Sequence, residues 1–224
     1  MKASEGRSAR KHRQIIEAAT SVFMKSGYDG TSMEEIAAQA EVSKQTVYKH
    51  FADKERLFSE MVLATTGQMD RLVALVAGPL ADTRSLKKDL TVLGRQFIAS
   101  LMDPPVLRLR RLVIANADRM PELGRAWYQQ GFERALATLA SCFGGLAKRG
   151  LLSVDDPLLA AHHFVGLLLW IPVNQAMFTG DEQPYSKIAL ERYADAAVST
   201  FLAAYEAKVT SSSDKSAVSP KGRS

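Results

Sequence analysis

The sequence predicts an all-α protein in which a small N-terminal unit of three helices precedes a larger helical region. Apolar residues recur at spacings of three and four through most of the chain, as they do on one face of a helix. Pro and Gly separate these periodic stretches at intervals typical of helix ends. The chain has 224 residues, of which 46% are hydrophobic, so it is long enough for two domains with a sizeable core.

The first two helices are expected before residue 41. Gly27 can end the first of them in a left-handed cap. Its apolar face would consist of Ile15, Ala18, Ala19, Val22 and Phe23. The second begins at TSMEEIAAQA, where either Thr31 or Ser32 can be the N-cap and either Glu34 or Glu35 can close a capping box. It would bury Ile36, Ala37 and Ala40.

The third helix is expected from Ser43 to about residue 50. With Ser43 as N-cap, Val42 and Val47 occupy the positions of a hydrophobic staple, and Val47 pairs with Phe51 four residues later. Asp53 can then cap a fourth helix, which continues to about residue 78.

Five further helices are expected near residues 83–102, 104–117, 121–149, 155–179 and 185–208. Residues 1–11 are polar and basic, so we expect a flexible leader there. Residues 209–224 have too little apolar surface to offset the entropy of ordering, and we expect a disordered tail.

Composition gives weaker indications. The formal net charge of +5 and the pI near 9.3 favour a polyanionic partner, but residues 1–60 carry ten Lys and Arg against nine Asp and Glu. The single cysteine, Cys142, cannot form an intramolecular disulfide, and no signal peptide opens the chain, so we expect a cytoplasmic protein. The unbroken apolar run from Phe164 to Val173 is too short to span a membrane, which favours a buried helix or a subunit interface.

The second and third helices form a helix-turn-helix pattern. With its apolar residues inward, the third helix would present Lys44, Gln45, Thr46, Tyr48, Lys49 and His50 outward. Such a helix fits the major groove of double-stranded DNA, where Lys, Gln and Thr can read base edges. Ser32 and Ser43 lie at helix N-termini, and with Tyr48, His50 and Lys54 they are candidates for phosphate contacts. The alternative is that these side chains form the ordinary solvated surface of a small helical domain.

The stretch TSMEEIAAQAEVSKQTVYKHFADKERLF resembles the DNA-binding domain of the TetR/AcrR family of bacterial transcriptional repressors. A Thr/Ser-capped helix, an A-x-V-S turn, a T-x-Y-x-H-F recognition helix and a following K-x-x-L-F recur in that family. The resemblance implies DNA contacts by Lys44, Gln45, Thr46, Tyr48 and Lys49, and backbone contacts by Ser32, His50 and Lys54. Glu41 departs from the pattern, since the family most often has Gly in this turn, and a left-handed non-Gly residue costs about 1 kcal/mol.

The same resemblance implies a domain plan. Residues 12–58 would be the helix-turn-helix DNA-binding domain, and residues 59–208 the helical ligand-binding and dimerisation domain. Arg7, Arg10, Lys11 and Arg13 would either form an arm that enters the minor groove or belong to a solvated leader.

Bulky side chains of the larger domain could line an apolar cavity for a small-molecule effector, or they could be plain core. The candidates are Phe97, Met102, Trp127, Tyr128, Phe132, His163, Leu167 and Trp170. Arg108, Arg111 and Arg119 lie near one side of a helix, where they could meet an anionic ligand or simply be solvated. The adjacent His162 and His163 would point in different directions on a helix, so we expect no metal site, and nothing indicates a cofactor. We also expect no enzyme, because no phosphate-binding loop or nucleophile motif is present.

The last two expected helices, 155–179 and 185–208, are apolar on more than one face and must be covered. In the family, two such helices from each subunit form a four-helix interface, so the resemblance implies a homodimer on a palindromic operator. Candidate interface residues are Phe164, Gly166, Leu167, Tyr193, Ala197 and Phe201. We therefore expect a ligand-released transcriptional repressor. The alternative is a helical small-molecule or partner-binding protein whose helix-turn-helix no longer reads DNA.

Overall fold

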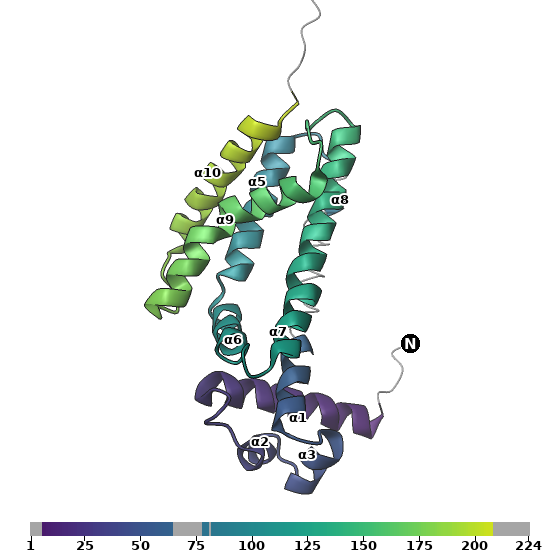
Figure 1. Cartoon of the computed structure of the whole chain (residues 1–224), viewed down its shortest axis with the longest axis vertical. Coiled ribbons are helices and arrows are strands. Elements are labelled where there is room, and N and C mark those ends of the chain that lie inside the picture. Colours follow the sequence, from purple (N-terminus) through teal and green to yellow (C-terminus); the bar gives the residue numbers. More distant parts are fainter. Residues whose placement is uncertain (1–5, 65–77, 81, 208–224) are drawn as a thin grey trace, which may run out of the picture.

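The computed structural model describes residues 6–64, 78–80 and 82–207, and the described chain is helical, with one isolated β-bridge and no strand. The prediction of an all-α fold is confirmed. Helices α1, α2 and α3 lie at one end of the elongated molecule, and α5, α8, α9 and α10 form a bundle at the other end (Figure 1). The helices are α1 (Arg7–Ser26), α2 (Met33–Gln39), α3 (Lys44–His50), α5 (Leu86–Leu101), α6 (Pro104–Ala115), α7 (Pro121–Trp127), α8 (Arg134–Lys148), α9 (Pro157–Thr179) and α10 (Lys187–Tyr205), with a further helix over residues 54–64.

The N-terminal helices begin and end where local chemistry dictates. Ser32 is the N-cap of α2 and accepts a hydrogen bond from the Glu35 backbone N–H at 3.1 Å. Ser43 caps α3 in the same way, with the Thr46 backbone N–H at 3.2 Å. Between them, Glu41 takes the left-handed conformation with φ of 50°, which its place in the turn predicted. The turn therefore places a non-Gly residue in the left-handed region, at a cost of about 1 kcal/mol.

The large bundle has an aromatic centre. The rings of Phe143, Phe164 and Phe201 are mutually packed with centroids between 5.0 and 5.5 Å apart, and all three side chains are fully buried. Nearby, α5 and α10 approach closely at Gly94, where an added Cβ would lie 3.1 Å from a methyl group of Val198. Packing of this density holds α5, α8, α9 and α10 together.

The apolar core around the N-terminal helices does not stop at the expected domain boundary. It includes residues of α1, α2, α3 and the helix over 54–64, and it continues into the second half of the chain. The contributions from that half are Leu109, Val113, Met120 and Leu123. The segment α6–α7 therefore packs directly against the N-terminal helices.

The structure corrects two expected boundaries. Helix α1 begins at Arg7, so Arg7, Arg10 and Lys11 lie on its first turns and not in a flexible leader. The single helix expected over 121–149 is interrupted by a π-helical turn at Tyr128–Glu133. Residues 1–5, 65–77, 81 and 208–224 lie outside the described residues, so the expected disorder of the tail and the expected extension of the fourth helix to about residue 78 are not tested.

Candidate nucleic-acid interface and regulatory region

The outer face of α3 carries the side chains proposed for DNA contact. Val47 is fully buried on the inner face, while Lys44, Gln45, Tyr48 and Lys49 are exposed. Gln45, Thr46, Tyr48 and Lys49 also line a shallow hollow on the surface. The helix therefore presents a continuous polar face of the kind that enters a DNA groove.

Two of these side chains are engaged within the chain. Lys44 forms an ion pair with Glu34 of α2, which raises the pKa of the lysine and lowers that of the carboxyl. The Thr46 hydroxyl lies 2.8 Å from that of Ser43. A base contact by Lys44 thus requires the ammonium to leave Glu34, whereas Gln45 and Lys49 face solvent directly.

His50 is the last residue of α3, and its side chain lies beside His12 of α1. Its ring centroid is 5.9 Å from that of His12, and His12 in turn lies 2.9 Å from a carboxylate oxygen of Glu60. The pKa of His50 is lowered, mainly because the ring is partly buried and to a smaller extent because His12, Lys49 and Lys11 lie nearby. A neutral His50 is therefore the form expected at neutral pH, and it can offer one N–H to a phosphate.

Lys54 is placed differently from the expectation. Its ammonium donates to the backbone carbonyls of Tyr28 and Thr31, each at 2.9 Å, and lies 4.5 Å from the centroid of the Tyr28 ring. The sequence made Lys54 a candidate for a phosphate contact, whereas in the structure these carbonyls engage its ammonium. Thr31 precedes Ser32, so Lys54 fixes the segment that leads into α2.

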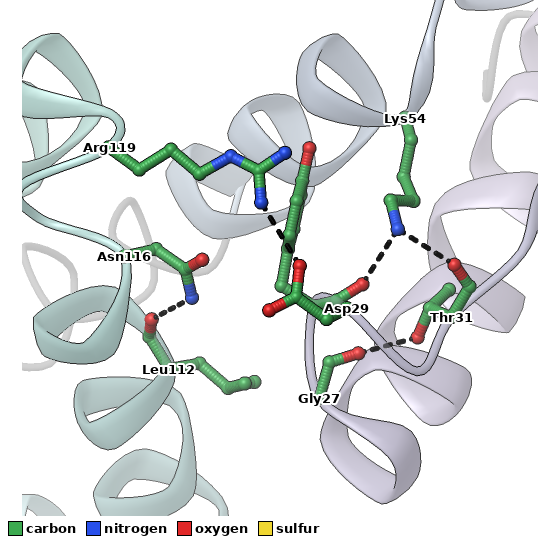
Figure 2. Close-up of polar contacts among 8 residues, drawn as sticks. Gly27, Asp29, Thr31, Lys54, Leu112, Asn116 and Arg119 are labelled. Carbon is green, nitrogen blue, oxygen red and sulfur yellow. Dashed lines mark hydrogen bonds and ion pairs between the residues drawn. The ribbon is translucent and has the colours of Figure 1, made fainter.

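The same segment is contacted from the regulatory half of the chain. Arg119, in the turn after α6, forms an ion pair with Asp29 at 3.0 Å, and its guanidinium carbon lies 4.9 Å from the Tyr28 ring centroid. Figure 2 shows Lys54 and Arg119 converging on the segment from Gly27 to Thr31. The entry to α2 is thus linked to the α6–α7 segment.

The eight side chains proposed to line an effector cavity do not meet in one place. Phe97 and Met102 belong to the core of the bundle. Trp127, Tyr128 and Phe132 form an aromatic cluster around the π-helical turn. His163 and Leu167 line an open pocket of about 370 Å³ between α9 and α10. Trp170 is 69% exposed on α9.

The proposed interface residues also divide. Phe164, Ala197 and Phe201 are buried in the chain's own core, so the expectation that they contact a second subunit is wrong. Gly166 is exposed, whereas Leu167 and Tyr193 are partly exposed. Exposed neighbours on α9 include Leu159, Trp170 and Phe178, the last being 86% exposed.

Within the described part of the chain, two arginines of α6 have a polar partner and the third, Arg110, has none. Arg108 pairs with Glu182 at 2.9 Å, and Arg111 donates to the carbonyls of Ala176 and Asp181 at 2.7 Å each. Arg110, which sequence analysis did not single out, is only 6% exposed. Its spacing of three from both Leu107 and Val113, which are buried, was the available signal.

Helix α9 is also the one helix among the described residues that is long and apolar enough to span a membrane by length and composition. Here it packs against α8 and α10. Among the same residues, no group of three or more His, Cys, Asp and Glu side chains is placed to hold a metal ion.

Comparison with known proteins agrees with this architecture. Residues 15–61 match the family described as bacterial regulatory proteins of the tetR family, and residues 88–207 match the C-terminal domain of AefR-like transcriptional repressors. A TetR-family transcriptional regulator from Mesorhizobium loti is 58% identical, with a TM-score of 0.87 over 90% of this chain and 100% of that one.

Two other relatives are more distant. The flavonoid-responsive regulator FrrA is 28% identical, with a TM-score of 0.70 over 88% of this chain and 97% of that one. The HTH-type transcriptional regulator YdeS of Bacillus subtilis is 33% identical over 79 residues, 35% of this chain and 36% of YdeS. The match thus spans about a third of this curated relative.

The structure and the two matched families indicate the same architecture. Helix α3 is a capped helix with an exposed polar face, and the α6–α7 segment packs on the N-terminal helices. The chain belongs to the TetR family of DNA-binding transcriptional regulators.

Proposed function

We propose that the protein is a cytoplasmic repressor that binds a palindromic operator as a homodimer and is released by a small-molecule effector. This proposal rests mainly on helix α3, which exposes Gln45, Tyr48 and Lys49 on its outer face while its inner face is buried against the rest of the domain. The match of residues 88–207 to AefR-like repressors supports repression. The flavonoid response in the name of FrrA supports a small organic effector.

Dimerisation is supported by the outer face of α9 and α10. Leu159, Gly166, Trp170 and Phe178 leave apolar surface on α9, and the pocket at His163 and Leu167 opens on the same pair of helices. An exposed apolar surface of this kind marks an interaction site. A two-fold axis through this face would place two copies of α3 for two half-sites of DNA.

Release is proposed to act through α6–α7. This segment shares a core with the N-terminal helices and contacts the Gly27–Thr31 segment through Arg119. A ligand that shifts it would change the position of α2 and α3. To take the protein from 1:99 to 99:1 off DNA, the ligand must favour the released conformation by about 5.5 kcal/mol.

The proposal is tested by selection of randomised double-stranded DNA with the full-length protein. A palindrome whose half-sites are about one helical turn apart, or a multiple of it, is expected. Absence of any enriched sequence, with the protein folded and dimeric, would instead support a protein that no longer reads DNA.

Replacing Gln45 with Ala is expected to weaken operator binding by about 1–3 kcal/mol and to relax preference at one symmetric pair of positions, because a Gln amide can bond two adenine atoms. Gln96→Ala, an exposed change on α5, is the matched control. Competition titration against single-base variants of the operator gives the measurement. An unchanged base preference would exclude Gln45 from readout.

Lys49→Ala is expected to weaken binding to specific and random DNA alike and to reduce the slope of log affinity against log salt by about one, since one phosphate contact is lost. Lys148→Ala removes an exposed lysine at the far end of α8 and controls for net charge. If the two variants have the same slope, Lys49 makes no phosphate contact.

A further inference from the structure

Arg110 is a buried cation to which the described part of the chain supplies no polar partner. Among the described residues it takes part in no hydrogen bond or ion pair, and its Nε atom is covered and has no acceptor. Of the other arginines of α6, Arg108 has a carboxylate, and Arg111 donates to two carbonyls through a terminal nitrogen, although its own Nε is also buried without an acceptor. Arg110 therefore requires a separate explanation, since an unpaired buried charge costs several kcal/mol.

Two aromatic rings lie beside the guanidinium of Arg110, and neither supplies a hydrogen-bond acceptor. Its central carbon lies 5.1 Å from the centroid of Phe132 and 5.8 Å from that of Trp127. Ring faces attract a cation, which helps to retain the charge, but they leave the N–H groups without oxygen partners. Burial lowers the pKa of Arg110 to about 10, so the group remains charged at neutral pH.

The wall of the site is irregular at this point. Phe132 lies in the π-helical turn Tyr128–Glu133, and its ring stacks on that of Tyr128 with centroids 5.7 Å apart. Turns of this kind are rare and occur frequently at functional sites, because they redirect side chains from the regular helical positions. Here the turn places Phe132 beside Arg110.

The missing partner can be deduced from another arginine in the same chain. Arg95 binds the Asp195 carboxylate side-on, with Nε at 2.7 Å from one oxygen and a terminal nitrogen at 2.6 Å from the other. Planar carboxylates favour this two-point geometry. Arg110 has the same Nε edge, buried and without its acceptor. Arg110 is the arginine of α6 whose guanidinium lies against the Trp127 and Phe132 rings, and a single positive charge at that place fits a monoanion better than a phosphate dianion.

We propose that the effector is a small organic acid whose carboxylate binds the Nε edge of Arg110, with its apolar body against the aromatic cluster of Trp127, Tyr128 and Phe132. This inference deepens the proposed function, since it rests on the effector binding in this domain. The anion would displace the side chains that now cover Nε and satisfy the donor that the unliganded protein leaves unpaired.

The first test needs no ligand. Arg110→Met keeps the apolar stem and removes the unpaired charge, so it is expected to raise the melting temperature of the unliganded protein by about 5 °C. Arg111→Met is the matched control on the same helix and should lower the melting temperature, because two carbonyls lose their donor. Destabilisation by Arg110→Met comparable to that of Arg111→Met would show that the charge is paired within the chain and overturn the proposal.

The second test uses matched ligands. Benzoate, 3-phenylpropanoate and decanoate are titrated calorimetrically against wild type and Arg110→Met, each beside its uncharged amide, with inorganic phosphate as a further arm. At least one acid is expected to bind wild type, with affinity about 30-fold or more above that of its amide and a similar loss in Arg110→Met. Binding of none of the acids, equal binding of acid and amide, or a preference for phosphate would overturn the assignment.

Operator titrations with the same acid separate this inference from the proposed function. An acid that binds through Arg110 without weakening operator binding would uphold the site and overturn effector release. An acid that releases wild type and Arg110→Met equally would uphold release and place the site elsewhere.

Discussion

Gly166→Arg is expected to give a folded monomer whose operator affinity is lower by at least two orders of magnitude. Gly166 is exposed on α9, and an added Cβ would meet nothing within 4 Å inside the subunit. The new side chain therefore costs little in the isolated chain. In the proposed dimer it would bury an unpaired charge, which costs several kcal/mol, and each 1.4 kcal/mol changes an association constant tenfold. Each separated subunit could then contact only one half-site of the operator.

The measurement is sedimentation velocity beside operator titration, with circular dichroism to confirm helix content. Gly145→Arg is the control, since Gly145 is also exposed, on α8, with nothing within 4 Å of an added Cβ. It should leave the dimer and operator binding unchanged. A dimeric Gly166→Arg protein with normal operator affinity would show that the interface lies away from this part of α9.

Lys54→Met is expected to lower the free energy of unfolding by about 2–3 kcal/mol and to weaken operator binding. The carbonyls of Tyr28 and Thr31, both buried residues, would lose a charged donor, and hydrogen bonds to charged groups contribute about 1.5–3 kcal/mol. The Tyr28 ring would also lose its cation. Because the segment leading into Ser32 is then less fixed, α2 and α3 would be presented to DNA less well.

The salt dependence distinguishes this role from a phosphate contact. Chemical denaturation gives the stability, and titration at several salt concentrations gives the slope. The slope should stay at the wild-type value for Lys54→Met, whereas it falls by about one for Lys49→Ala. A Lys54→Met protein of normal stability with a slope reduced by one would show that Lys54 contacts a phosphate.

Sequence predicted the N-terminal helices well because their ends depend on local chemistry. Ser32 and Ser43 cap α2 and α3, and Glu41 takes the left-handed turn, each through groups within a few residues. Lys54 shows where local reasoning fails. Its partners, Tyr28 and Thr31, lie more than 20 residues away, and no periodicity indicates them.

The larger domain was predicted only in outline. Apolar positions on all sides of α9 indicated that it must be covered, but not which side its own chain covers, so Phe164 was wrongly assigned to the interface. The π-helical turn at Tyr128–Glu133 was missed because its sequence is compatible with a regular helix. Arg110 could have been found, since it lies among the buried positions of α6.

The core shared by the N-terminal helices and α6–α7 has a consequence for how the molecule melts. Leu109, Val113, Met120 and Leu123 belong to the same apolar core as Phe23 and Phe58, so neither part is expected to lose its packing alone. Unfolding should therefore follow one cooperative transition, with the same midpoint for probes in either part. Since any ligand of the folded state stabilises it by mass action, an effector bound far from α3 would raise the melting midpoint reported by a probe on α3.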